Sequence, residues 1–205
     1  DTQALIKSAI LNKLLFDGLI YGLDRKSARE PLASLFYDFS YNVDQNNIAV
    51  VRLRSLVAKI FNLDVDLNKV DFETTTQACN INFANGYVIL LHGTSRIDKQ
   101  WSFDNWLKLA QWLIANSSQQ IVITYSNDSE YSFCQQLFNE LRSDRITIVD
   151  KLPFAQLSDL IFNSQLVVGV DTGFTHYANL VSRPTIGIYL DSIPQYGGIM
   201  ESSIA

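Results

Sequence analysis

The sequence predicts an α/β protein whose second half is a Rossmann-like domain, that is, a parallel sheet with helices on both faces. Two observations support this prediction. After residue 86, short runs rich in β-branched residues alternate with stretches of about ten residues that have helical periodicity, which is the pattern of βαβ units. Hydrophobic residues make up 47% of the chain and charged residues 18%, enough apolar material for a packed core. The first half is predicted to be part of a second Rossmann-like domain.

Residues 1–62 are predicted to be the remnant of this other domain. The expected elements are helices over 3–16, 27–36 and 48–61 and a strand at 21–23. Apolar residues recur at helical spacing in these helices, and Pro31 fits the first turn of the second one. The helices outnumber the strands on which they should pack. We therefore expect the opening strands of this domain to lie upstream of Asp1.

Residues 63–85 are predicted to be a linker because aspartate, asparagine and threonine dominate there. The linker contains Asp64-Val65-Asp66, which matches the D-x-D pattern of metal-dependent sugar transferases. This pattern lies outside the predicted core strands, so we interpret it as a solvated run. No metal site is expected, because the two histidines, His92 and His176, fall on different loops without further candidate ligands.

Residues 86–205 are predicted to be the second domain. The expected strands are 87–91, 121–125, 146–149, 166–170 and 185–189, and the expected helices are 103–115, 130–141, 154–162 and 175–180. Right-handed crossovers between such units give a doubly wound sheet. In these sheets, ligands bind beyond the carboxyl ends of the strands, so the loops that follow the strands are the candidate sites.

The loop from Val170 to His176 joins a predicted strand to a helix. Gly173 allows a ligand to approach the backbone closely, and the free amides at a helix start favour a phosphate. Thr172 and Thr175 add hydroxyl donors, and His176 is placed to donate to a phosphate oxygen. Capping of the helix by Asp171 or Thr172 explains the pattern equally well.

The loop over 92–101 follows the first strand of the second domain and offers Gly93, Thr94, Ser95, Arg96 and Lys99. Hydroxyl and amide donors with a compact cation suit a diphosphate. An ordinary polar loop, with a solvated Arg96, is the alternative. Two such loops at the same edge of a sheet favour a phosphate site more strongly than either loop does alone.

The loop after the next strand carries Glu130, whose carboxylate is suited to accept hydrogen bonds from ribose hydroxyls. Asp128 and Ser129 are at least as well explained as helix caps. Glu130 is therefore the functional candidate in this loop.

Composition narrows the class of protein. Cys79 and Cys134 lie far apart, which argues against a disulfide framework and favours the cytosol. No apolar run approaches the roughly 20 residues of a membrane-spanning helix.

Residues 1–60 hold eight Lys and Arg against six Asp and Glu, whereas residues 61–205 hold eight against fifteen. The more basic first portion fits an anionic substrate or lipid surface, although a solvated surface explains it better. Without a basic and aromatic patch, nucleic acid is not an expected partner.

The same loops resemble those of the lipopolysaccharide heptosyltransferases of glycosyltransferase family 9. Residues 92–101, H-G-T-S-R-I-D-K-Q-W, are similar to the family segment H-A-T-T-R-D-D-K-H-W, and residues 170–176, V-D-T-G-F-T-H, are similar to V-D-T-G-L-S-H. Residues 1–9 and 28–37 resemble D-x-Q-G-L-I-K-S-A and A-R-E-P-L-A-S-L-F-Y. The A-R-E-P-L-A segment and the T-S-R-x-D-K loop are typical of type I enzymes, whereas the type II loop is similar to G-x-A-K-R-W. The resemblance extends from Asp1 to about Gly198.

The resemblance implies a glycosyltransferase-B fold of two Rossmann-like domains and an inverting, metal-independent transfer without a cofactor. L-glycero-D-manno-heptose would move from ADP-heptose to the Kdo sugar of Kdo-lipid A. The implied setting is the cytoplasmic periphery of the inner membrane of a Gram-negative bacterium, and we expect a monomer.

The resemblance also implies roles for individual residues. Thr94, Ser95 and Lys99 would hold the diphosphate, with Lys99 stabilising the leaving group, together with Thr172, Gly173 and the helix start near His176. Asp171 would lie by the donor sugar and Glu130 by the adenosine ribose. Arg29 and Lys7 would lie on the acceptor side.

This sequence departs from the family pattern in three places. The aspartate general base of the family would lie before Asp1, so no catalytic base is assigned. The family segment Y-G-P-T-D-P corresponds to residues 189–194, Y-L-D-S-I-P, which puts the donor contacts there in doubt. The chain also ends at Ala205, before the closing helices that the family fold includes.

Two other functions remain open from the residues alone. One is another nucleotide-sugar enzyme of the same fold, either a different family 9 transferase or a sugar epimerase. The other is a nucleotide-binding module without catalysis. Affinities for ADP and UDP, together with a transfer assay, would separate these possibilities.

Overall fold

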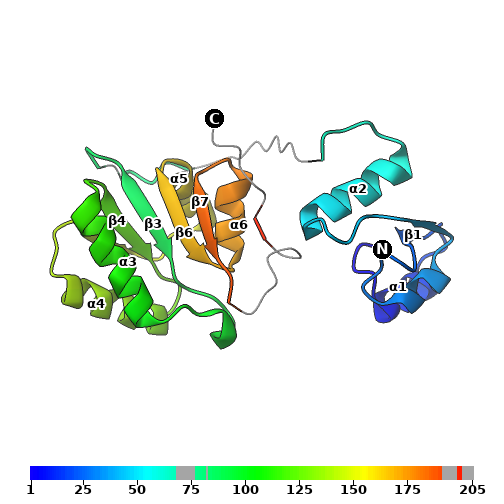
Figure 1. The fold of residues 1–205 in the computed structure, drawn as a ribbon, viewed down its shortest axis with the longest axis horizontal. Coiled ribbons are helices and arrows are strands. Elements are labelled where there is room, and N and C mark those ends of the chain that lie inside the picture. Colours follow the sequence, from blue (N-terminus) through cyan, green and yellow to red (C-terminus); the bar gives the residue numbers. More distant parts are fainter. Residues whose placement is uncertain (68–76, 82, 191–197, 200–205) are drawn as a thin grey trace. The chain divides into compact units, whose positions relative to one another are not determined.

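The computed structural model describes residues 1–67, 77–81, 83–190 and 198–199, and these form two compact units (Figure 1). The first unit comprises the described residues up to 67 and the second those from 77 onward. The division between them falls within the predicted linker range of 63–85.

The second unit is built on a five-stranded parallel sheet. Its strands are β3 (Tyr87–Leu91), β4 (Gln120–Thr124), β5 (Ile146–Val149), β6 (Leu166–Val170) and β7 (Thr185–Ile188). The strand order is β5-β4-β3-β6-β7, and every neighbouring pair is parallel. The chain therefore starts in the centre, winds outward to β5 and returns to β6 on the other side of β3. Ligands bind at such a switch point, beside the carboxyl ends of β3 and β6.

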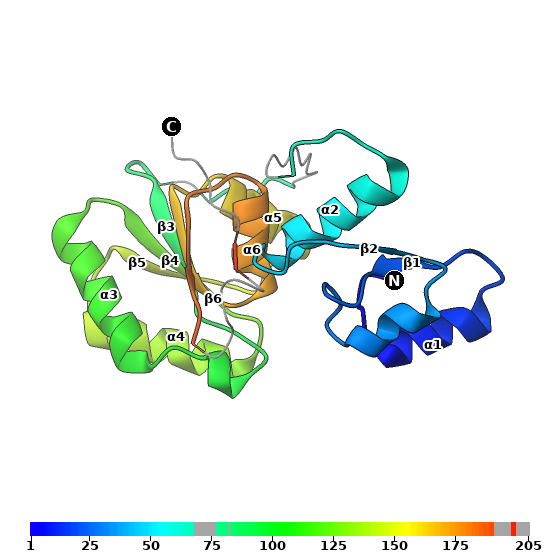
Figure 2. The same cartoon turned by 45° about the vertical axis from the view of Figure 1, so that its right-hand side comes forward.

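Helices cover both faces of this sheet (Figures 1 and 2). The helices are α3 (Phe103–Asn116), α4 (Asp128–Leu141), α5 (Phe154–Phe162) and α6 (Gly173–Leu180). Alternate residues of each strand face opposite sides, so Val88 and Leu90 pack with α3 and α4, whereas Ile89 and Leu91 pack with α5 and α6. All five residues of β3 are buried for this reason. The prediction of a Rossmann-like α/β domain is confirmed.

The predicted elements of this unit match the observed ones with shifts of at most two residues at their ends. The start of α4 is the instructive case. The sequence indicated a cap at Asp128 or Ser129, but the cap is Asn127, whose side chain accepts a hydrogen bond from the Glu130 amide at 3.0 Å. The helix consequently begins at Asp128 rather than at Glu130.

The end of the predicted linker packs onto the second unit. The Cys79 amide donates to Asp159 Oδ2 at 2.9 Å, and the Gln77 amide donates to the Ala155 carbonyl at 3.2 Å. Ile81 also packs against the core. The polar composition of this segment obscured Cys79, Ile81 and Phe83, which pack in the core cluster that includes α5.

The first unit contains α1 (Ile6–Leu15), β1 (Tyr21–Leu23), the 3-10 helix η1 (Pro31–Phe36), β2 (Phe39–Tyr41) and α2 (Ala49–Phe61). The strands β1 and β2 pair in parallel. A small buried cluster of Ala4, Leu23, Ala28, Val43 and Leu56 joins α2 to them.

The predicted helix over 27–36 is wrong in its first part, and β2 was not predicted. Asp24 Oδ1 accepts hydrogen bonds from the amides of Lys26 and Ser27 at 3.0 and 2.8 Å, and this Asx turn replaces helical hydrogen bonding. Ser27 is buried and its hydroxyl accepts from the Val43 amide at 2.8 Å. β2 has only three residues, too few to show alternation.

In the ranges that the structure describes, no helix combines the length and apolarity needed to cross a bilayer.

Trp106 is expected to contribute strongly to the stability of the second unit. It is 1% exposed within the cluster beneath α3, whereas Trp112 on the same helix is 60% exposed. Trp106→Ala should lower the free energy of unfolding by about 3–5 kcal/mol because it leaves a large cavity. Trp112→Ala, the matched control, should change it by no more than about 0.5 kcal/mol. Urea unfolding followed by circular dichroism measures both, and equal losses would contradict the expected packing.

Candidate functional site

Loops that follow β3, β4 and β6 line one pocket of about 340 Å³ in the second unit. Its polar lining includes Thr94 and Ser95 after β3, Glu130 at the start of α4, and Thr172 after β6. The structure therefore brings four predicted site residues together, from loops that are far apart in the sequence. Their common position at the switch point follows from the strand order.

An ion pair joins the loops after β3 and β6. Lys99, at the end of the short 3-10 helix η2 (Ile97–Lys99), places Nζ 2.6 Å from Asp171 Oδ2. The other carboxylate oxygen of Asp171 lies 3.1 Å from His176 Nε2. The Asp171 side chain is 13% exposed and that of Lys99 is 22% exposed. An ammonium has three N–H donors, so Lys99 keeps donors for a ligand while it binds Asp171.

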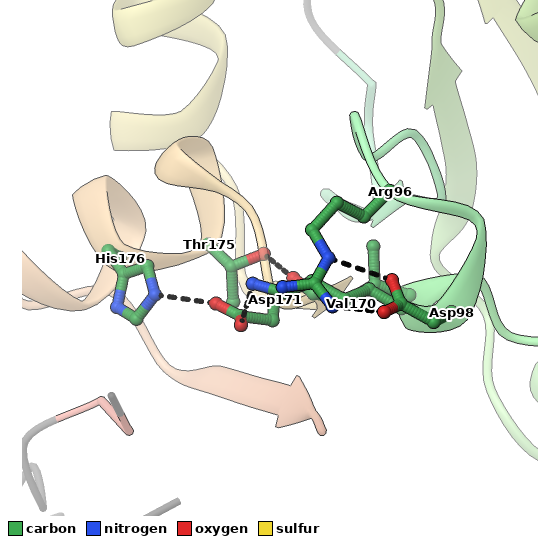
Figure 3. A network of polar contacts seen from close by, with 7 residues as sticks. Arg96, Asp98, Val170, Asp171, Thr175 and His176 are labelled. Atoms are coloured by element: carbon green, nitrogen blue, oxygen red, sulfur yellow. Dashed lines mark hydrogen bonds and ion pairs between the residues drawn. The ribbon is translucent and has the colours of Figure 1, made fainter. Parts of the chain in front are cut away.

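Figure 3 shows the Asp171 carboxylate between His176 on one side and the pair of Arg96 and Asp98 on the other. Arg96 Nε donates to Asp98 Oδ1 at 2.9 Å. The Arg96 side chain is 57% exposed, so this pair lies at the surface. Cationic side chains thus gather around Asp171 although the chain as a whole is acidic, with a net charge of −5.

The start of α6 offers amides and open space. Thr172 occupies the N-cap position, but its side chain makes no capping hydrogen bond, and it lines the pocket. A Cβ atom added to Gly173 would meet no atom within 4 Å, chain neighbours aside. The first amides of a helix have no intrahelical acceptors and carry a partial positive charge. These features suit an anionic group.

Thr175 has a structural role instead of the predicted donor role. It is buried, and its hydroxyl donates to the Val170 carbonyl at 2.7 Å. This bond ties the first turn of α6 to the end of β6 and removes the hydroxyl from the ligand side. His176, predicted to face a phosphate, contacts Asp171 in this structure.

Two hydrogen bonds from Ser126, in the loop after β4, hold the Glu130 carboxylate in position. Its Oε2 accepts from the Ser126 amide at 2.7 Å and from the Ser126 hydroxyl at 2.8 Å. A Cβ atom on Gly93 would lie 2.6 Å from Glu130 Oε1, so a side chain there would displace the Glu130 carboxylate from this position. Ser126 was not predicted as a site residue, although its place directly after a strand was a usable signal.

A buried histidine, His92, directly precedes Gly93 and packs against α4. The His92 ring stacks on Phe133 with centroids 4.3 Å apart, and Nε2 lies 4.0 Å from Cys134 Sγ. Burial lowers the pKa of His92, against a smaller opposing effect of Glu130. Burial also raises the pKa of the Cys134 thiol to about 12, so both groups are neutral near pH 7. They link β3 to the α4 turn that carries Glu130.

Part of the pocket lining is apolar, which the sequence analysis did not predict. Leu157 of α5 and Phe174 of α6 line it together with Tyr125. The neighbours of Phe174, Gly173 and Thr175, indicated a phosphate site at a helix start, so the sequence analysis gave Phe174 no role of its own. Its position one residue after Gly173 was the signal available.

The two predicted acceptor-side residues, Lys7 and Arg29, are exposed in the first unit. Their neighbours are bonded to each other, since Glu30 Oε2 accepts from the Ile6 amide at 2.6 Å. The structure therefore places both cations beside the N-terminus of α1. Their predicted role in acceptor binding stays a prediction.

Among the residues described, no three His, Cys, Asp or Glu side chains are grouped so as to hold a metal ion. Asp64-Val65-Asp66 lies near the end of the described part of the first unit, and all three residues are exposed.

Comparison with known proteins gives a consistent result. The model of glycosyltransferase family 9 (heptosyltransferase) matches residues 1–204. Lipopolysaccharide heptosyltransferase 1 of Salmonella typhimurium is 31% identical over 191 residues, which cover 92% of this chain and 59% of that protein. The chain thus spans about three fifths of the length of this relative.

Solved heptosyltransferase structures are also similar to this chain. The structure of E. coli heptosyltransferase WaaC with ADP has a TM-score of 0.76 at 29% identity, covering 98% of this chain and 62% of that one. The structure of WaaC with ADP-2-deoxy-2-fluoro heptose has a TM-score of 0.74 at 30% identity and covers 98% and 63%. These comparisons also support the predicted glycosyltransferase-B arrangement of the fold.

The buried His92 should make stability depend on pH. Because its pKa is lower in the folded protein, the unfolded chain takes up a proton first as the pH falls below about 6.5. The free energy of unfolding should therefore decrease from about pH 7 to pH 5, with a slope of up to about 1.4 kcal/mol per pH unit for this group. Urea unfolding of the wild type and of His92→Gln at several pH values measures it. The His92→Gln variant should lack the pH-dependent part of the free energy of unfolding that His92 contributes. If the free energies of the two proteins change in parallel with pH, the prediction is contradicted.

Proposed function

The chain belongs to glycosyltransferase family 9, and we propose that its protein transfers L-glycero-D-manno-heptose from ADP-heptose to the Kdo sugar of Kdo-lipid A with inversion. Relatives named lipopolysaccharide heptosyltransferase 1 support the sugar and the pathway. The WaaC structures with ADP and with an ADP-heptose analogue support the donor.

The observation that carries the proposal is the meeting of the β3 and β6 loops, with Lys99 Nζ 2.6 Å from Asp171 Oδ2. The same loops place the hydroxyls of Thr94, Ser95 and Thr172 on one pocket. A cation, small hydroxyls and helix-start amides together suit a pyrophosphate. The first part of the proposal is therefore that this pocket binds the ADP portion of the donor.

The chemistry follows from where charge develops. When the bond between the heptose C1 and the diphosphate oxygen breaks, negative charge grows on the departing ADP. Lys99 and the amides at the start of α6 are fixed donors that stabilise this charge in place. Asp171 accepts hydroxyl hydrogen bonds from the sugar, and Glu130 accepts those of the ribose. The acceptor hydroxyl gives its proton to a base that we do not assign within this chain.

The acceptor side of the proposal rests on Arg29 and Lys7. Both are exposed cations in the first unit, suited to an anionic lipid substrate. We propose accordingly that the protein acts as a monomer at the cytoplasmic surface of the inner membrane of a Gram-negative bacterium. An assay of heptose transfer by the full-length protein tests the whole reaction.

Binding of ADP to this chain tests the site directly. Isothermal titration calorimetry should detect ADP binding, with UDP weaker. Lys99→Ala should reduce the ADP affinity by about 1.5–3 kcal/mol, or about 10- to 150-fold, because a charged hydrogen bond is lost. Lys108→Ala, an exposed lysine on α3, is the matched control and should bind like the wild type.

A folded wild-type chain that binds no ADP at millimolar concentration would overturn the proposed donor site. If ADP binds but the Lys99 and Lys108 variants behave alike, the pocket stands and the role of Lys99 fails.

Gly173 provides an independent test of the phosphate position. Because a methyl group there meets open space in the protein, Gly173→Ala should keep or slightly raise the free energy of unfolding, as helical Gly to Ala changes do. The same methyl group would occupy the place of a phosphate oxygen, so ADP affinity should fall at least about tenfold. Urea unfolding and calorimetry separate these effects. Unchanged ADP affinity would exclude a phosphate at the α6 start.

A further inference from the structure

We propose that Phe174 determines base specificity, its ring stacking on the purine base of the donor nucleotide. This inference rests on the proposed function, because it takes the pocket as a nucleotide site. It assigns a role to the apolar lining of the pocket, to which the residue pattern gave none.

The pocket lining combines two kinds of chemistry. Thr94, Ser95 and Thr172 supply hydroxyls, while Leu157 and Phe174 supply apolar surface. A nucleoside diphosphate needs both, because it has a charged diphosphate, a ribose and a flat apolar base. Glu130 belongs to the polar lining and comes from a third loop, that of β4.

Phe174 is fixed in position rather than free on the surface. It is partly buried against the core on the α5 and α6 side of the sheet. Its ring centroid lies 6.0 Å from that of Phe154, which in turn meets Tyr177 edge-on at 5.5 Å. Phe154 itself is 61% exposed and does not line the pocket. The aromatic cluster thus supports Phe174 from behind and leaves part of its surface to the pocket.

The location of Phe174 links the base to the phosphate site. It follows Gly173, whose open space and helix-start amides suit the diphosphate. One turn of backbone therefore supplies both a phosphate donor and a base-stacking ring. In the similar family segment V-D-T-G-L-S-H, leucine takes this position, so the aromatic ring is a feature of this chain.

An aromatic ring favours a purine over a pyrimidine because the larger base shares more stacking area. Stacking of a base on an aromatic side chain is worth several-fold to about a hundredfold in affinity when the ring is removed. Phe174 should accordingly act on the base and not on the diphosphate.

Calorimetry on the full chain with ADP, UDP and inorganic pyrophosphate tests this assignment. Phe174→Ala should weaken ADP binding at least about tenfold, weaken UDP less, and leave pyrophosphate unchanged. Phe174→Trp should restore ADP binding, and Phe174→Leu should fall between alanine and the wild type. Phe138→Ala, a partly exposed phenylalanine of α4 outside this pocket, is the matched control.

Each other outcome has a defined meaning. If ADP and pyrophosphate weaken equally in Phe174→Ala, the residue supports only the α6 start and the proposal fails. If ADP affinity is unchanged in that variant, stacking is excluded. Absence of ADP binding to the wild type would instead overturn the proposed function. Circular dichroism confirms that each variant is folded, and Phe174→Trp keeps the test informative where the alanine variant is not.

Discussion

The site depends on the parallel pairing of β3 with β6. Paired residues of these strands are 78 positions apart in the sequence, as Ile89 and Val167 are, because the chain forms β4 and β5 before it returns to β6. Their pairing brings the carboxyl ends of both strands to one edge, where Thr94, Ser95 and Thr172 line the pocket. The ion pair of Lys99 and Asp171 forms only because the loop after β3 and the loop after β6 leave the sheet side by side.

The packing beneath the pocket has the same origin. His92 ends the buried run of β3, and its neutral ring stacks on Phe133 of α4. Gly93 then passes so close to Glu130 that a side chain would collide with its carboxylate. The polar rim is thus attached to the apolar core through residues that change little in charge near neutral pH. Fixed donors and acceptors of this kind need no reorganisation when charge appears on a ligand.

The sequence was sufficient for the periodic elements and for the loops that end them. Strands such as β3 and β6 are buried on both faces, so continuous apolar runs identify them. Sequence reasoning failed where side chains replaced backbone hydrogen bonds: Asp24 formed a turn in place of a predicted helix, and Asn127 capped α4 ahead of the expected residues. Such contacts depend on which neighbours a fold supplies. The same limit explains why Thr175 was mistaken for a ligand donor, because its acceptor is a carbonyl in its own loop.

The negative charge of Asp171 is unfavourable beside an anionic ligand unless neighbouring cations balance it. A carboxylate beside a diphosphate site repels the ligand, and at 13% exposure water screens this repulsion poorly. Lys99 and His176 both bind this carboxylate, and Figure 3 shows Arg96 close by. A carboxylate has about four acceptor positions, so Asp171 keeps room for sugar hydroxyls while its charge is balanced. Lys99 consequently serves two partners at once, Asp171 and the proposed diphosphate. This geometry allows the proposed acceptor for a neutral sugar and the proposed anion site to lie together where the loops after β3 and β6 meet.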